Sequence, residues 1–437
     1  MKIKSLTLRN YKRFTNEQTI SFCNEQGQVN DITLLIGENG SGKTSILQAI
    51  TAVIGAASRP KMKVHELDWD GFDYPFIQTT NIPLRMEMDI EFTAEEREKT
   101  RSYAEELKQL GRRIPHLAND NTVVRLFFNY NNRIVYANTT ANYYQFSGYQ
   151  YALQLKKYRT DYLNLFDDVG TIYWYTEQRT AHSIQNLDYN VKNTDALRNI
   201  LAKMHYFHLH RLQKDIELRP GQRDSFETLN NLYQKVFPTR SLLGAEPNRD
   251  DMNKTDFWLN DGYNDYELSG LSAGERAVFP ILLDFALMNI NNSIIIIDEI
   301  ELHLHPALLR DFLKVLPNLG NNNQFIITSH SPYVLRELPK ENILIAKDGK
   351  VQPINVFTKG RDVSSIIEEL FGIPRRTPEA LQKIEAFYAA ITQQQLDIAK
   401  QLLNEMETEW GTLDEGVVRA QMYYEDLLND MEDEIHQ

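Results

Sequence analysis

Hydrophobic positions along the chain follow two periods, which together predict a mixed α/β fold. Strict alternation over residues 2–10 and 82–92 predicts strands with one buried face, the second of them carrying Leu84, Met86, Met88 and Ile90 on that face. Continuous apolar runs predict fully buried strands at 31–36, 171–175, 293–300 and 324–330. Helical stripes separate most of these runs, for example Val278, Leu282, Phe285 and Met288. This order indicates a mainly parallel sheet covered on both faces, with residues 82–92 in an antiparallel, half-exposed strand.

Residues between these patterns give weaker signals. We expect a polar helix over 93–110, a hairpin over 122–137, helices near 194–218 and 225–236, and a polar loop with a short strand over 241–266. Residues 343–346 should begin a final hairpin. From residue 361 onward the chain predicts helices alone, with Thr377 and Pro378 as the first cap and first turn of one of them and Gly411 as the end of another.

A glycine-rich run carries the first chemical signal. Its residues are Gly37, Glu38, Asn39, Gly40, Ser41, Gly42, Lys43 and Thr44, which fit the phosphate-binding pattern G-x-x-x-x-G-K-[ST] and are followed by Ser45. The run follows a predicted buried strand and opens a predicted helix with Leu47, Ile50 and Ile54 on one face, so a chance glycine-rich turn is a poor alternative. Loop amides and the helix N-terminus favour phosphate. We expect Lys43 to reach the β- and γ-phosphates and Thr44 to bind Mg²⁺.

Two acids end the apolar run at 294–297 and suggest the second half of the same site. A phosphate-binding loop needs an acidic residue at the end of a strand beside its own strand, where it supports Mg²⁺, and Asp298 suits that role. Glu299 is placed to orient the attacking water. A solvated strand end is the alternative, and four preceding isoleucines make a central strand the better hypothesis.

Two further segments have both a structural and a functional interpretation. Ser272 followed by Glu275 is a capping box, and the same helix N-terminus, with Gly274, can bind a γ-phosphate. In that case the nucleotide belongs to a second copy of the protein. His330 closes a buried strand, as a core histidine often does, and beside a phosphate-binding sheet it can instead sense the γ-phosphate.

Other candidates favour structural interpretations. Residues 11–14, YKRF, are interpreted as a solvated strand end, with a basic or aromatic contact to a nucleotide base as the alternative. Two histidine groups, one formed by His303 and His305 and one by His205, His208 and His210, match no standard zinc spacing and are treated as structural.

Composition limits the function classes. The net charge is -13, which disfavours a broad basic surface for nucleic acid, although local basic clusters remain at 156–159 and 211–219. Cys23 is the one cysteine, which excludes internal disulfides and cysteine-rich zinc modules. No apolar run is long enough to cross a bilayer, and there is no signal-peptide pattern, so we expect a cytoplasmic protein without membrane contact.

Four motifs occur in one order and together resemble the ABC-type ATPase heads of the SMC, RecF and OLD-like families. They are GENGSGKT at 37–44, LSAGE at 271–275, IIIIDEIELHLHP at 294–306 and ITSHSPYVL at 327–335. The resemblance implies a P-loop ABC-type head in which two copies sandwich two ATP molecules. It implies that Lys43 and Thr44 bind phosphate and Mg²⁺, that Asp298 supports Mg²⁺, that Glu299 is the catalytic base and His330 the switch histidine. Ser272 and Gly274 would act on the partner's ATP, and Gln178 would contact Mg²⁺ and water.

The resemblance also suggests a domain organisation. We expect an N-terminal lobe at 1–94, a mixed α/β and helical insertion at 95–265, a C-terminal lobe at 266–358 and a helical extension at 359–437. The segment 360–374 and the helical tail look similar to the ATPases of Septu-type and retron-linked antiphage systems, which implies a separate HNH-type nuclease and contact with DNA or retron RNA/DNA. A RecF-like repair ATPase that clamps DNA directly is the alternative, followed by a scaffold that binds nucleotide without turnover.

Overall fold

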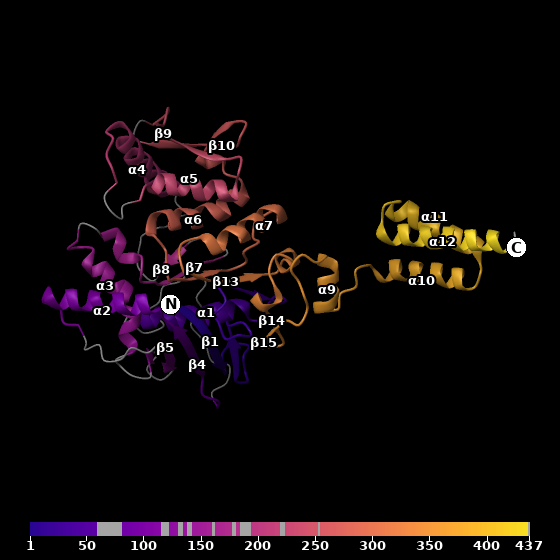
Figure 1. The fold of residues 1–437 in the computed structure, drawn as a ribbon, viewed down its shortest axis with the longest axis horizontal. Helices are drawn as coiled ribbons and strands as arrows, with labels where there is room; N and C mark the ends of the chain where they lie inside the picture. The colour runs from indigo at the N-terminus through magenta and orange to yellow at the C-terminus, as the bar shows by residue number, and fades with distance from the viewer. Residues whose placement is uncertain are drawn as a thin grey trace. The chain divides into compact units, whose positions relative to one another are not determined.

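The computed structural model describes residues 1–58, 81–114, 122–129, 134–137, 142–159, 162–176, 181–183, 194–218, 223–251 and 254–435. The chain divides into two compact units, residues 1–363 and 364–437. Figure 1 shows the order of the elements along the chain. Within the described residues, no helix combines the length and the apolar character that a membrane span requires.

A seven-stranded sheet forms the centre of the first unit. Its strands are, in spatial order, β15 (Lys350–Pro353), β14 (Ile343–Lys347), β3 (Ile32–Ile36), β13 (Gln324–Ser329), β12 (Ile294–Ile297), β7 (Ile172–Tyr175) and β8 (Ala181–Ser183). The strands from β14 to β7 are parallel, and β15 and β8 pair antiparallel at the edges. Every residue of β3, β12, β13 and β7 is buried. The predicted mainly parallel sheet and its continuous apolar strands are therefore confirmed.

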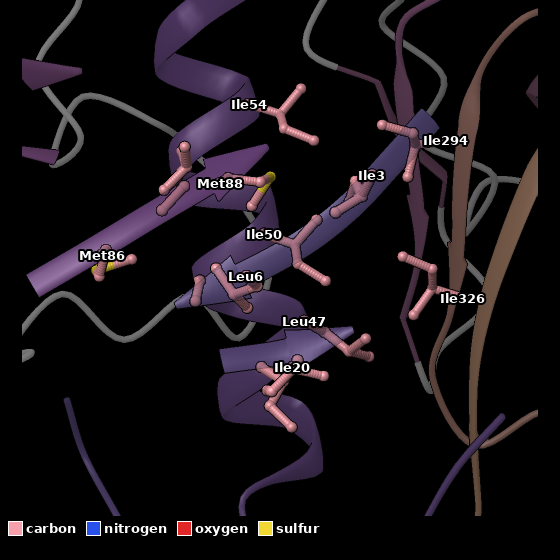
Figure 2. Close-up of a cluster of buried hydrophobic side chains, with 14 of the residues drawn as sticks. Ile3, Leu6, Ile20, Leu47, Ile50, Ile54, Met86, Met88, Ile294 and Ile326 are labelled. Atoms are coloured by element: carbon pink, nitrogen blue, oxygen red, sulfur yellow. The ribbon is translucent and has the colours of Figure 1, made fainter. Parts of the chain in front are cut away.

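A second, antiparallel sheet carries the alternating strands. Its order is β2 (Gln18–Ser21), β1 (Lys2–Arg9), β4 (Arg85–Glu91), β5 (Val123–Asn129) and β6 (Ile134–Ala137). Helix α1 (Lys43–Ser58) lies between the two sheets. In Figure 2, Leu47, Ile50 and Ile54 of this helix lie among β1 and β4 residues on one side and Ile294 and Ile326 on the other. Packing from both sides explains why every residue from Ile46 to Ile54 of this helix is buried.

The middle of the chain contributes to both sheets and to two smaller layers. Helix α2 (Ala94–Gln109), capped by Thr93, packs with α3 (Gly148–Leu155). Helices α4 (Thr194–Gln213) and α5 (Ser225–Val236) pack on a three-stranded antiparallel sheet of β9 (Ser241–Pro247), β10 (Thr255–Asn260) and β11 (Asp265–Glu267). We expected a polar loop with one short strand over 241–266, and the loop part of this prediction is wrong because three strands form there. Only a few residues there, such as Leu242, Phe257 and Leu259, are buried, so the alternation was too short to predict strands.

The remaining helices of the first unit are α6 (Ala273–Met288), α7 (Pro306–Val315) and α8 (Pro332–Leu335). Short 3₁₀ turns occur at Asn142–Ser147, Tyr162–Phe166, Leu268–Gly270, Leu316–Asn318 and Lys340–Asn342. Strands of the predicted insertion, 95–265, belong to both large sheets, and the boundaries proposed for the four parts of the chain stay a prediction.

The second unit is helical, as predicted. Helix α9 (Val363–Phe371) begins at its boundary and is followed by α10 (Pro378–Thr392), α11 (Leu396–Trp410) and α12 (Glu415–Ile435). Thr377 caps α10 by accepting the Ala380 N–H at 3.3 Å, and Gly411, at φ 83°, ends α11. Phe387, Leu403, Met406 and Val417 form a core between the last three helices.

Candidate nucleotide site

The glycine-rich loop connects β3 to α1 in a conformation that requires its glycines. Gly37 has φ 150°, and a Cβ there would lie 2.2 Å from the carbonyl oxygen of Ala346 in β14. Gly42 has φ 106°, and its Cβ would lie 3.0 Å from the ring of Phe14. Neither conformation nor space admits a larger side chain. The loop is thus fixed by the strand on one side and by residues 11–14 on the other.

Residues 11–14 are not the solvated strand end that we expected. The rings of Tyr11 and Phe14 are fully buried, and the backbone turns between them through Lys12, at φ 47°, with hydrogen bonds in both directions between the two residues. The turn directs both rings inward. Arg13 lies against Gly40 of the loop, where its guanidinium nitrogen would be 3.0 Å from a Cβ added to that glycine. The prediction of a solvated strand end failed because strand alternation would place Tyr11 and Phe14 on opposite faces. The turn at Lys12 instead places both rings on the same, buried side.

Lys43 is the central cation of the site. It is 5% exposed, and its Nζ donates to the carbonyls of Gly37 at 2.9 Å and Glu38 at 3.0 Å, with His330 Nδ1 at 3.4 Å. Burial lowers the pKa of Lys43, against the opposing effect of the nearby carboxylates of Asp298, Glu299 and Glu301. Among the described residues, no carboxylate pairs directly with the ammonium, which is held on neutral carbonyls that a phosphate can outcompete.

Ser41 adds a second group suited to phosphate. Its residue is 7% exposed, and its hydroxyl has no hydrogen-bond partner among the described residues. A buried hydroxyl without a partner is costly, and a phosphate oxygen in the loop would supply one.

Asp298 follows β12 and contacts both the loop helix and β13. The Thr44 hydroxyl lies 3.3 Å from Asp298 Oδ2, and the Thr328 hydroxyl donates to Asp298 Oδ1 at 2.5 Å. The prediction that the strand of Asp298 lies beside the loop strand is wrong, because β13 separates β12 from β3. Hydrophobic pattern specifies that strands are central and gives no information on their order.

Glu299 adopts the left-handed conformation, with φ 49°, which is strained for a residue with a Cβ. Its N–H donates to the Thr328 hydroxyl at 2.8 Å, so one hydroxyl holds the backbone of Glu299 and the carboxylate of Asp298. The Glu299 carboxylate lies 3.7 Å from His330 Nε2, and both side chains are about a third exposed, at 35% and 31%. The strain directs this carboxylate to the solvent edge beside His330.

Glu301 is a site residue that sequence reasoning missed. Its Oε1 accepts the backbone N–H groups of His330 at 2.5 Å and Ser331 at 3.1 Å, and its Oε2 is buried without a hydrogen-bond partner among the described residues. This carboxylate therefore fixes the backbone that carries His330. The sequence signal was a third acid two positions after Glu299.

The donor set fits Mg²⁺ better than a metal that requires a full protein cage. Thr44 and Asp298 offer hard oxygen ligands next to the loop, and Mg²⁺ commonly takes one or two protein ligands and completes its shell with phosphate and water. Among the described residues, no group of three or more His, Cys, Asp or Glu gathers as a metal site. Gln178 lies outside the described residues.

The predicted capping box at the start of α6 is present and is buried in a larger network. Glu275 accepts the N–H of Ser272 at 2.9 Å and its hydroxyl at 2.6 Å. Its other oxygen accepts the hydroxyls of Tyr233 and Tyr266, each at 2.5 Å, and pairs with Arg240. Burial alone would raise the pKa of Glu275, but these hydrogen-bonding partners lower that pKa to about 2. These contacts connect the LSAGE segment, residues 271–275 and hereafter the signature, to α5 and β11.

The histidine groups have structural contacts. His305 caps α7 by accepting the N–H of Ala307 at 3.3 Å, and His208 pairs with Asp224 at 2.6 Å. The His205 ring lies against Gly244 and Phe226. These contacts agree with the structural interpretation of both groups.

Curated relatives that match parts of this chain include two retron ATPases and a Septu protein. The retron Ec83 probable ATPase of Escherichia coli is 34% identical over 120 residues, which cover 25% of this chain and about a fifth (22%) of that protein. The retron Vc95 probable ATPase of Vibrio cholerae serotype O1 biovar El Tor is 23% identical over 397 residues, 80% of this chain and 74% of that protein. The Septu protein PtuA of Bacillus mycoides is 24% identical over 139 residues, 29% of this chain and 20% of that protein.

Among solved structures, an SMC head bound to the C-terminal winged-helix domain of ScpA aligns with 82% of this chain and 98% of its own, at 16% identity and a TM-score of 0.45. A family model described as an AAA ATPase domain matches residues 1–335, which contain the loop, the signature, Asp298, Glu299 and His330. By this match over most of its length, the chain belongs to the AAA_15 family of AAA ATPase domains.

Proposed function

We propose that this protein is the ATP-binding and ATP-hydrolysing regulatory subunit of a bacterial antiphage complex, in which pairs of heads sandwich ATP and control a separate HNH-type nuclease. The observation that carries the ATPase part is the contact network of Lys43, Thr44, Asp298, Glu299 and His330, which come from three distant segments. The antiphage part is supported by similarity to retron and Septu proteins.

The chemistry assigns a role to each group. Loop amides, Lys43 and Ser41 would hold the phosphates of ATP, and Thr44 with Asp298 would hold Mg²⁺, which offsets charge on the β- and γ-phosphates. A water attacks the γ-phosphorus, the bond to the β–γ bridging oxygen breaks, and ADP and inorganic phosphate form. Glu299 accepts the proton that the water releases. His330, held by Glu301 and 3.7 Å from Glu299, would contact the γ-phosphate.

The second copy would complete this site. Ser272 and Gly274 stand at the N-terminus of α6, where the helix dipole favours an anion. In the proposed dimer they face the γ-phosphate held by the partner's loop. Glu275 of this helix forms an ion pair with Arg240, which lies between α5 and β9. A shift of α6 on ATP binding would therefore move α5 and the sheet β9–β11.

A RecF/SMC-like ATPase that clamps DNA directly is the second candidate, and one observation favours it. Residues 1–363 hold 42 Lys or Arg and 44 Asp or Glu, so the unit with the nucleotide site is nearly neutral although the chain carries -13. The acidic total is therefore a weak argument against DNA at the head. This candidate predicts DNA-stimulated hydrolysis that decreases steeply with salt.

The test is a Glu299→Gln variant, purified after co-expression with the genomic neighbours of the protein. We expect turnover to decrease by roughly 10²–10⁴-fold, the usual contribution of a positioned base, while ATP binding and an ATP-dependent doubling of mass persist. A Glu25→Gln variant, at an exposed site on the same unit, is the matched control and should hydrolyse ATP like wild type.

The outcomes separate the parts of the proposal. Wild-type turnover in Glu299→Gln would exclude this residue as the base. A trapped dimer that holds a stoichiometric nuclease supports the regulatory role, and a trapped dimer that instead retains DNA and no nuclease supports the repair candidate.

A further inference from the structure

The two units differ sharply in charge. Residues 364–437 hold 5 Lys or Arg against 16 Asp or Glu, so this unit carries nearly all of the net charge of -13. Nothing in the proposed nucleotide chemistry requires this excess, because a phosphate site needs cations. A concentrated negative charge on a small helical unit instead favours a cationic partner.

Helix α12 adds an apolar surface to this acidic unit. Its inner side, with Val417 and Ala420, packs on α10 and α11. Its outer side exposes Val418, Met422 and Tyr423 at 37%, 61% and 60%, next to the exposed acids Glu425 and Asp426. The Tyr423 ring packs edge-on against Tyr388 of α10, with centroids 5.7 Å apart, which extends the apolar patch toward that helix.

We propose that the α12 outer face, defined as Val418, Met422, Tyr423, Glu425 and Asp426, is the docking surface for a basic amphipathic helix of a partner protein. An amphipathic helix offers apolar side chains to Met422 and Tyr423 and flanking Lys or Arg to the two acids. Methionine adapts to different apolar partners, and tyrosine gives a large contact at low entropic cost. The inference rests on the proposed function only in assuming that a separate protein partner exists.

Charge selects this occupant over two others. Nucleic acid is repelled by a surface whose acids outnumber its cations. A second copy would bring an equally acidic unit against this one, and like charges facing each other oppose association. A cationic helix satisfies both the apolar patch and the surrounding carboxylates.

The experiment measures binding of a fluorescent Leu/Lys amphipathic peptide of about 18 residues, roughly 27 Å of helix, to the full-length protein by anisotropy. The Met422→Ser/Tyr423→Ser variant should bind at least about tenfold more weakly, because two large apolar contacts are lost. The Glu425→Lys/Asp426→Lys variant should lose a similar factor, and its residual binding should be less sensitive to salt. The matched control is Glu25→Lys/Glu98→Lys, which reverses two exposed acids in residues 1–363 and should leave peptide affinity unchanged.

Several results would overturn the proposal. One is peptide affinity within roughly twofold of wild type in the Met422→Ser/Tyr423→Ser variant. Others are equal binding of a Leu/Glu peptide, competition by a single-stranded oligonucleotide, or self-association that only the α12 variants abolish. ATP turnover, measured on the same samples, should stay unchanged in all α12 variants. Since Glu299→Gln should still bind the peptide, failure of the docking surface and failure of the ATPase assignment give different results.

Discussion

The two halves of the nucleotide site are held in different ways. The loop half is local: Lys43 contacts carbonyls of Gly37 and Glu38, and glycines set the backbone. The carboxylate half is assembled from side chains about thirty residues apart, since Thr328 holds Asp298 and Glu299, and Glu301 holds His330. Substitutions in the first half should therefore change binding without unfolding the protein, whereas those in the second should change turnover and stability together.

The largest effect should come from Lys43→Ala. Loss of two charge-assisted hydrogen bonds to phosphates, at about 1.5–3 kcal/mol for each bond, should weaken ATP binding by roughly 10²–10⁴-fold. The melting temperature should stay the same or rise, because a buried ammonium is removed. Calorimetric titration with ATP and a thermal melt check both points, and a clear loss of stability would break the distinction between the halves.

Glu301→Ala should lower turnover by about tenfold, because the backbone of His330 loses a charged acceptor worth about 1.5–3 kcal/mol. Glu301→Gln is the matched control, since its amide oxygen can still accept both N–H groups. Steady-state ATPase rates across pH measure the effect. Equal rates for the alanine and glutamine variants would show that Glu301 does not position His330.

Thr328→Val keeps the shape of the side chain and removes its hydroxyl. The N–H of Glu299 then lacks its acceptor and Asp298 lacks a donor, so we expect a loss of about 1–3 kcal/mol in unfolding free energy and a several-fold decrease in turnover. Denaturant unfolding and ATPase assays measure both, and Thr328→Ser should restore most of each. A stable and fully active valine variant would show that the Thr328 hydroxyl is not needed to position Asp298 and Glu299.

The smallest effect on the nucleotide site should come from Asp284 of α6, which accepts the Tyr175 hydroxyl at 3.0 Å and should give stability a pH dependence. Burial raises the pKa of Asp284 to about 7. An acid with a raised pKa in the folded state stabilises the protein while protonated, and this contribution is lost as pH rises from about 4 to 7. Asp284→Asn should therefore gain roughly 1–3 kcal/mol relative to wild type between pH 5 and pH 8. Parallel slopes of unfolding free energy against pH for the two proteins would contradict this.

The difference between the loop half and the carboxylate half also explains which parts of the site could be predicted from the sequence. The loop, its strand and its helix are contiguous, so spacing and period identified Lys43 and Thr44 together with the buried face of α1. Capping chemistry likewise identified Ser272 and Glu275. Glu301 and Thr328 act through contacts between strands, and no local pattern reports which strands are neighbours. The order β3, β13, β12 and the three-stranded pairing of β9–β11 were missed for the same reason, because pairing partners lie outside the window in which periodicity is measured.

The position of β3 has a consequence for synthesis of the chain. Its two neighbours in the sheet are β13 and β14, residues 324–347, although β3 itself spans residues 32–36. While a ribosome makes the residues between them, a five-residue apolar strand has neither partner, and its unpaired edges resemble those that seed aggregation. Closure of such distant pairs is slow, so we expect this strand to need shielding, by α1 and the β1–β4 sheet or by a chaperone, until residue 347 has emerged.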